Sequence, residues 1–192
     1  MNIFVLNTHP VYAAQEQCDK HIVKMVLESG QMLSTAHRML DGELYYALTE
    51  KGRKVKRYRL PDDRESVLYK AVHFNHPCTV WTMENSANYT WHYTHFKALA
   101  DEFEYRFEKP HQTWLDLKDA LFNPPNNIAI TDRLTKFKLA MGAEPQCINE
   151  ADPVGSYQNF YVTKQKRFEM SWSKRQKPTW FIEKTNRLLV NH

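Results

Sequence analysis

Glycine is scarce in this sequence: the 192 residues include only five, whereas ordinary usage would give about 13. None of the five approaches the spacing of a glycine-rich phosphate loop. That excludes P-loop nucleotide enzymes and Rossmann-type dinucleotide enzymes. It also disfavours an all-β fold, because tight hairpin turns commonly require glycine.

Cysteine and long apolar runs are also scarce. Cys18, Cys78 and Cys147 are an odd count at wide spacing, so the sequence predicts no disulfide framework. No apolar run has transmembrane length, and no signal-peptide pattern is present. We therefore expect a protein of a reducing, cytoplasmic compartment.

Charge is unevenly distributed along the chain. The formal net charge is +4, but residues 1–150 are close to neutral. Residues 151–192 contain eight Lys and Arg against three Asp and Glu. A basic C-terminal segment with interleaved aromatic residues is compatible with a polyanionic partner.

The periodicity of apolar residues predicts a mainly α-helical fold, with residues 1–192 forming a single compact domain. Apolar residues at steps of three and four predict two long helices, over 11–40 and 79–108. A β-hairpin insertion is expected over 44–60. Residues 152–192 are expected to form a basic C-terminal helix and tail.

Shorter elements are expected between these. Residues 2–6 predict a strand or a packed extended arm. Short helices are expected over 66–74, 114–121 and 134–141. Asp152, followed by proline, has the pattern of a helix N-cap.

One polar stripe interrupts an otherwise apolar turn of the first predicted helix. Its residues are spaced by three or four, which places them on one helix face. They are His21, Lys24, Glu28, Gln31, Thr35 and Arg38. The stripe is either the solvated face of the helix or a set of acid–base and ligand-binding groups, and the apolar run 22–27 favours the second. Gly30 implies either a close helix crossing or room for a substrate.

Two further patterns have both a structural and a functional interpretation. Cys18 and His21, with His76 and Cys78, could form a tetrahedral metal site if the two segments met, although packed cysteines and histidines are commoner. The loop that contains Asn75 and His76 either sets the entry of the next helix or reaches a base or phosphate.

Two clusters of basic residues are candidate contacts to nucleic acid. Residues 51–59 contain six basic residues and no acid, and the C-terminal segment forms the second cluster. Each can contact several phosphates, and Trp180 offers a face for stacking on a base. The candidate phosphate contacts are Lys54, Lys56, Arg57, Lys174, Arg175 and Lys177.

Four short segments occur in an order that resembles known families. They are MNIFVLNTHP (1–10), the segment from Asp19 to Glu28, Phe74-Asn75-His76-Pro77, and Lys177-Pro178-Thr179-Trp180. In this order the chain resembles a widespread group of small phage-encoded proteins, many without an assigned function. More distantly, it resembles the pyrimidine-dimer DNA glycosylases of the phage endonuclease V type.

This resemblance implies an all-helical fold, a host-cell cytoplasmic location and base excision from DNA. The family's catalytic carboxylate follows a histidine by seven residues, as Glu28 follows His21. Its N-terminal amine attacks the sugar C1′ of a flipped nucleotide and forms a Schiff base. Asn2 is expected to leave Met1 in place, so the amine is that of Met1, Lys24 or Lys20, or strand cleavage is absent.

The leading hypothesis is a base-excision DNA glycosylase, with or without AP-lyase activity, that needs no cofactor or metal. Its predicted partner is duplex DNA with a flipped or modified base. Its predicted catalytic residues are Glu28, His21, Lys24 and Met1. Its predicted substrate-binding residues are Gln31, Asn75, His76, Arg38 and Trp180. The alternatives are a nucleic-acid-binding or host-interaction protein without catalysis, and a metal-dependent hydrolase that uses cysteine and histidine.

Overall fold

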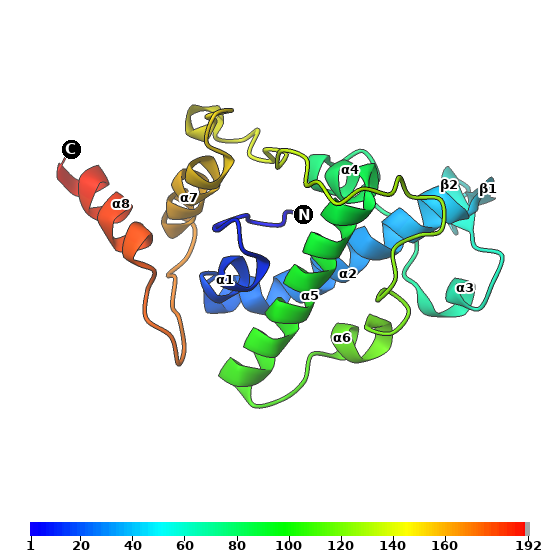
Figure 1. Ribbon diagram of the computed structural model, residues 1–192, viewed down its shortest axis with the longest axis horizontal. Helices are drawn as coiled ribbons and strands as arrows, with labels where there is room; N and C mark the ends of the chain where they lie inside the picture. Colours follow the sequence, from blue (N-terminus) through cyan, green and yellow to red (C-terminus); the bar gives the residue numbers. More distant parts are fainter. Residues whose placement is uncertain (191–192) are drawn as a thin grey trace.

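The computed structural model describes the backbone of residues 1–190 and the side chains of residues 1–187. Most of this chain is helical, with one small antiparallel sheet (Figure 1). The mainly α-helical prediction is therefore confirmed. The elements are α1 (Pro10–Gln15), α2 (Asp19–Asp41), β1 (Glu43–Leu48), β2 (Lys54–Arg59), α3 (Arg64–Val67), α4 (Pro77–Glu84), α5 (Ser86–Phe107), α6 (Gln112–Leu117), the 3-10 turn η1 (Pro145–Cys147), α7 (Pro153–Thr163), the 3-10 turn η2 (Lys164–Lys166) and α8 (Thr179–Val190).

Helices α2 and α5 pack against each other in the middle of the molecule. α4 and α6 also pack on α2, and α1 packs on α5. The first residues of the chain lie centrally among these helices, while the hairpin and α8 lie at opposite ends (Figure 1). One buried apolar cluster includes residues from Ile3 to Phe181. Among residues 1–190, no helix combines the length and the apolar character needed to cross a membrane.

The single helix predicted over 11–40 is divided into α1 and α2. The chain leaves the helical conformation at Cys18, whose backbone is extended. There the backbone bonds to side chains instead: the Tyr161 hydroxyl accepts from Cys18 N–H at 2.9 Å, and Arg106 donates to the carbonyl of Gln17 at 2.9 Å. The periodicity could not reveal the break, because both bonding side chains are distant in sequence.

The helix predicted over 79–108 is likewise divided, into α4 and α5. Asn85 is extended between them, and its side chain accepts from Asn88 N–H at 2.9 Å. Asparagine is among the best N-cap residues. The spacing of apolar residues therefore predicts helical structure over this range but does not reveal the cap at Asn85.

The helix predicted over 66–74 is wrong beyond Val67. The backbone groups of residues 68–72 form hydrogen bonds with side chains of α2. Arg38 donates to the carbonyls of Leu68 and Tyr69, and the Thr35 hydroxyl accepts from Val72 N–H. These bonds replace the backbone hydrogen bonds of a helix, so the segment is irregular and packs along α2.

The helix predicted over 134–141 is also wrong. The carbonyl of Lys138 accepts from the Tyr157 hydroxyl at 2.6 Å, and that of Ala140 accepts from the Asn2 side chain at 2.9 Å. Further along, α6 ends at Leu117 rather than at residue 121.

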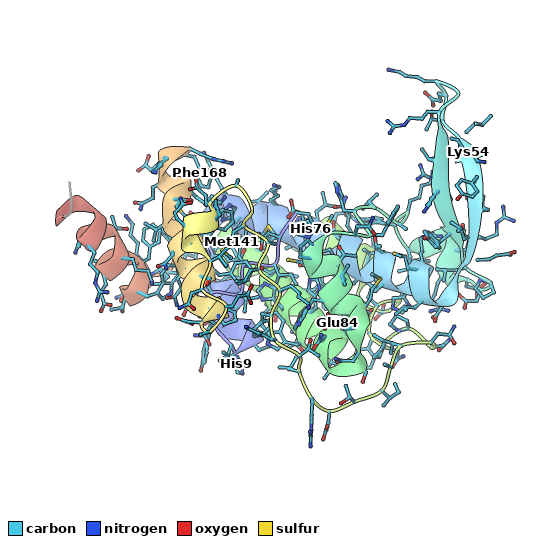
Figure 2. The ribbon with its side chains drawn as sticks, turned by 90° about the horizontal axis from the view of Figure 1, so that it is seen from above. His9, Lys54, His76, Glu84, Met141 and Phe168 are labelled. Carbon is cyan, nitrogen blue, oxygen red and sulfur yellow. The ribbon has the colours of Figure 1, made fainter. Side chains whose placement is uncertain are left out.

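The predicted hairpin is confirmed. Strands β1 and β2 pair antiparallel, with Glu43 opposite Arg59 and Leu48 opposite Lys54. The hairpin projects from the body of the molecule at the C-terminal end of α2 (Figure 2). Gly42 is required at its base, because a Cβ there would lie 2.4 Å from the carbonyl oxygen of Arg38.

Two roles are predicted for Gly30, and its surroundings support the first, a close helix crossing. A Cβ at this position would lie 2.7 Å from Thr113 and 3.0 Å from Leu117. Both residues belong to α6, so the glycine allows α6 to approach α2 closely.

The C-terminal segment begins as predicted, with Asp152 accepting from Gly155 N–H at the start of α7. A buried ion-pair cluster holds the following chain to the body. Glu102 accepts from Arg106 at 2.8 Å and from two atoms of Arg175, each at 2.9 Å.

Candidate functional site

The side chain of Glu28 is the centre of the candidate site. It lies on α2 and is 7% exposed, although most glutamates lie on protein surfaces. One carboxylate oxygen, Oε1, is 2.9 Å from Lys24 Nζ, one helical turn earlier. The other, Oε2, accepts from Asn2 N–H at 2.9 Å. Both oxygens thus have partners, one from the same helix and one from the start of the chain.

The amino group of Met1 lies next to the same carboxylate. Its nitrogen is 3.7 Å from Glu28 Oε2, and the two side chains are 4% and 10% exposed. The Met1 sulfur accepts from the Thr79 hydroxyl of α4 at 3.7 Å. The structure therefore brings together Met1, Lys24 and Glu28, three of the four predicted catalytic residues.

An extended apolar arm holds the amine in this position. Residues 2–6 form no strand; Ile3 and Leu6 are buried in the core. The Asn2 side chain accepts from Phe4 N–H at 2.9 Å and donates to Ala140. Phe4 has a φ of 55°, which an L-residue seldom adopts. The arm is thus tightly fixed, and Asn2 is a residue that sequence reasoning missed.

His76 immediately precedes α4 and is half-buried. Its Nδ1 accepts from Cys78 N–H at 3.2 Å and so caps α4. Burial lowers the pKa of His76, and the charges of the Met1 amine and His73 lower it further, against opposing effects of Glu28 and the Met1 backbone. The Met1 amine and Glu28 are thus close enough to influence the pKa of His76. Asn75, its neighbour, is exposed.

His21 occupies an aromatic enclosure two turns before Glu28. Phe4 stacks on its ring at 4.6 Å, and the Tyr161 hydroxyl lies 2.6 Å from its Nδ1. Burial lowers the pKa of His21 to about 3, assisted by the charges of Lys164 and Lys24. The ring is therefore neutral at physiological pH. Because no imidazolium forms, His21 cannot be a general acid, and this excludes one of the catalytic roles open to it.

The Tyr161 hydroxyl joins this ring to the N-cap of α2. It accepts from Cys18 N–H at 2.9 Å and shares a hydrogen bond with His21 Nδ1 at 2.6 Å. Sequence reasoning missed this role of Tyr161, because the hydrogen bond to His21 spans 140 residues.

The remaining predicted substrate-binding residues lie elsewhere. Arg38 uses all five of its N–H donors on carbonyls of 58–69 and on the Glu65 carboxylate, which assigns it to holding the hairpin rather than a substrate. Trp180 donates to Glu16 Oε2 at 2.9 Å and packs on Tyr161. Gln31, one turn after Glu28, is half-buried.

The predicted phosphate contacts fall into two groups. On the hairpin, Lys54 and Lys56 are exposed and Arg57 is half-buried. In the C-terminal segment, Lys174 pairs with Glu108 at 2.6 Å and Arg175 pairs with Glu102. Lys177, which is exposed, makes no ion pair within the described part of the chain. The basic residues of the hairpin are thus less engaged in ion pairs than Lys174 and Arg175 of the C-terminal segment.

The four residues of the alternative metal site do not form one. Within residues 1–190, no group of three or more histidine, cysteine or acidic side chains could hold a metal ion. Burial raises the pKa of the Cys18 thiol and raises that of Cys78 to about 11. Metal ligation requires the thiolate, so both environments oppose it.

Comparison with known proteins identifies no relative. No family model, no curated protein and no solved structure matches the chain.

Proposed function

We propose that the protein acts on DNA at an N-glycosidic bond, as a base-excision glycosylase with the Met1 amine as its nucleophile. The observation that carries this proposal is the amine nitrogen of Met1, 3.7 Å from the Oε2 atom of the buried Glu28. A primary amine forms a covalent imine with a sugar aldehyde carbon, and an adjacent carboxylate can accept the proton that the amine must first lose.

The proposed reaction begins with a proton transfer. Glu28 takes a proton from the Met1 ammonium, and the free amine attacks C1′ of a flipped nucleotide as the bond from C1′ to the base breaks. The base leaves with the bonding electrons and takes the proton that Glu28 received. The attached nitrogen then gives one proton, through Glu28, to O4′ as the C1′–O4′ bond opens, which forms the protonated Schiff base. Water hydrolyses this imine, releases the sugar and restores the Met1 ammonium. Glu28 also stabilises the positive charge that develops on the sugar.

Two neighbouring side chains assist at this carboxylate. Lys24, whose side chain is 62% exposed, holds Oε1 and faces solvent, from which a strand would approach. His76 provides an imidazole near the amine, and burial lowers its pKa, which favours the neutral form. A neutral imidazole can accept or donate a hydrogen bond to the departing base.

The hairpin supplies a surface for the rest of the duplex. It projects as a two-stranded ribbon (Figure 2) with six basic residues between Lys51 and Arg59. Its base lies some 14 residues beyond Glu28 on α2, or about 20 Å at 1.5 Å per residue. Phosphate contacts at this distance would position a duplex without specifying its sequence.

Borohydride trapping tests the proposal directly. Wild-type protein is incubated with duplexes that contain an abasic site or a modified base, and covalent adducts are counted with and without borohydride. We expect an adduct for the wild type and none for Glu28→Gln. Lys24→Met, which keeps the Met1 amine, should still form it. Absence of both adduct and base release over a broad panel of modified bases would refute the proposal.

The exposed cationic hairpin favours one other function, nucleic-acid binding or host interaction without catalysis. In that case Glu28→Gln would bind DNA normally, no substrate would release a base, and substitutions of Lys54 and Lys56 would abolish binding. The same panel of substrates therefore separates the two functions.

A further inference from the structure

The two faces of the hairpin differ in exposure. Residues directly opposite each other on paired strands point to the same face, and the register places Tyr45 opposite Arg57 and Tyr46 opposite Lys56. Because successive side chains alternate between faces, the first pair lies on one face, and the second pair lies with Lys54 on the other. Tyr45 and Arg57 are half-buried, whereas Tyr46, Lys54 and Lys56 are exposed. The hairpin thus has a sheltered face and an open face.

The sheltered face borders an open hollow of about 640 Å³. The strands contribute Arg57 to its lining, and the turn between them contributes Lys51 and Arg53. Lys70, which also lines the hollow, belongs to the irregular segment 68–72. The hollow therefore lies between the hairpin and the segment that packs along α2, and it brings together side chains from both.

Cations predominate in the lining of this hollow. There are four, Lys51, Arg53, Arg57 and Lys70, against one acid, Glu50. None of the four forms an ion pair within the part of the chain whose side chains are described. In that part, Arg57 donates to the carbonyl of the preceding residue at 3.2 Å, and the other three side chains make no hydrogen bond. The lining thus offers charged donors to an external anion.

The spacing of these donors suits an extended polyanion. Arg53 and Arg57 are four residues apart along β2 and the residue before it, which corresponds to about 13 Å. A single small anion cannot bridge that distance, whereas DNA carries a phosphate every 3.4 Å along each strand. Guanidinium groups also pair with a phosphate through two hydrogen bonds. Glu43, the other acid of the sheltered face, stands opposite Arg59 at the hairpin base, so the hollow itself stays cationic.

We propose that this hollow binds the phosphodiester backbone of the duplex that flanks the reacting nucleotide. The inference deepens the proposed function and rests on it for the identity of the DNA, while the preference for phosphates follows from the donors. The hairpin base lies about 20 Å from Glu28 along α2, which corresponds to about six base steps of 3.4 Å. Arg53, Arg57 and Lys70 are the assigned contacts. Lys54 and Lys56, on the open face, are not.

The test measures the affinity of an unmodified, fluorescein-labelled 20-base-pair duplex at several salt concentrations. Arg53→Gln/Arg57→Gln should bind about 10- to 60-fold more weakly at 0.1 M salt, and its slope of log affinity against log salt should fall by about 1.8, or 0.9 for each lost contact. Lys70→Met, outside the hairpin, should lower the slope by about 0.9. The matched control is Lys54→Gln/Lys56→Gln, which removes the same charge from the open face. Its slope should change by less than about 0.5, because salt screens charges over about 10 Å.

Each outcome decides one part of the inference. Equal losses of affinity and slope in the two double variants would overturn the assignment to the sheltered face. An unchanged slope in Arg53→Gln/Arg57→Gln or in Lys70→Met would overturn the hollow as a binding site. Polyglutamate should displace the duplex only weakly, and competition equal to that of unlabelled duplex at the same charge concentration would overturn the preference for phosphates.

This result is distinguishable from that of borohydride trapping, because the duplex is unmodified and no covalent step is measured. A protein that binds through the hollow but forms no adduct would refute the proposed reaction alone. A protein that forms the adduct but whose variants keep the wild-type slope would refute the hollow alone.

Discussion

Two buried glutamates of this protein, Glu28 and Glu102, have similar sequence patterns and different surroundings. Each lies on a long helix with a cation four residues away, and they are 7% and 3% exposed. The partners of Glu102 are the guanidinium groups of Arg106 and Arg175. Those of Glu28 are Lys24, the Met1 amine and a backbone N–H.

The type of cation decides what each carboxylate can do. Arginine stays protonated in proteins and forms rigid, bidentate pairs. Glu102 is therefore a permanent tie between α1, α5 and the C-terminal segment. Amines lose a proton far more readily and then become nucleophiles. The proposed function thus gives Glu28 a role in catalysis and Glu102 a role in stability, so each glutamate is a control for the other.

Glu28→Gln is expected to have the largest effect on activity. Loss of a group that moves protons typically costs 10²- to 10⁴-fold, so the yield of the borohydride adduct should fall to background. The free energy of unfolding should change by about 1 kcal/mol, because the pair with the exposed Lys24 is weak. Urea denaturation of the same sample measures it. A large loss of stability with the adduct retained would reverse the roles assigned to the two glutamates.

Glu102→Gln is expected to have the largest effect on stability. It leaves Arg106, whose side chain is fully buried, without its charge partner on α5, and breaking a buried pair costs about 3–5 kcal/mol. For a protein of this size the melting temperature should fall by roughly 2–4 °C per kcal/mol. Trapping, measured well below that temperature, should persist at near the wild-type rate. A variant that melts normally but forms no adduct would contradict this assignment.

The comparison also shows what the sequence could reveal. The stripe that includes Lys24 and Glu28, the scarcity of strands and the basic hairpin are local patterns, and each was predictable from neighbouring residues. Neighbouring residues did not predict four features: the breaks at Cys18 and Asn85 and the irregular segments 68–76 and 134–141. In three of these four places, side chains distant in sequence satisfy the backbone. Asn2 and Tyr161 were missed for the same reason.

The pH dependence of stability should reveal the buried, neutral His21. Its pKa falls from 6.5 when unfolded to about 3 in the folded protein, so the unfolded state alone binds this proton between those values. The contribution of His21 to the free energy of unfolding is therefore fully present above pH 6.5. It is lost as the pH falls, by roughly 2 kcal/mol between pH 7 and pH 5.

His21→Gln removes this contribution. The difference in unfolding free energy between pH 7 and pH 5, measured by urea denaturation, should be smaller by about 2 kcal/mol in the variant. A residual slope remains, since burial also lowers the pKa values of His37 and His95, each to about 4. An identical pH dependence in both proteins would show that His21 titrates normally.

Asn2→Leu should have the smallest effect, about a tenfold slower rate of adduct formation. The substitution removes the bonds to Phe4 and Ala140 that fix the arm, and misplacing a reacting group lowers the rate. Leucine is large enough that Met1 should be retained, which mass spectrometry verifies. The matched control is Asn7→Leu, because Asn7 makes a similar turn with His9 and a bond to Glu16, away from Glu28. Equal slowing in both variants would refute a positioning role for Asn2.

The most direct test of the central claim is to identify the residue that joins the DNA. Wild-type protein is trapped with borohydride on an abasic duplex, digested, and mapped by mass spectrometry. The geometry of the Met1 amine and Glu28 predicts that the modification lies on the α-amine of the N-terminal peptide. An adduct on Lys24 or Lys20 would contradict it.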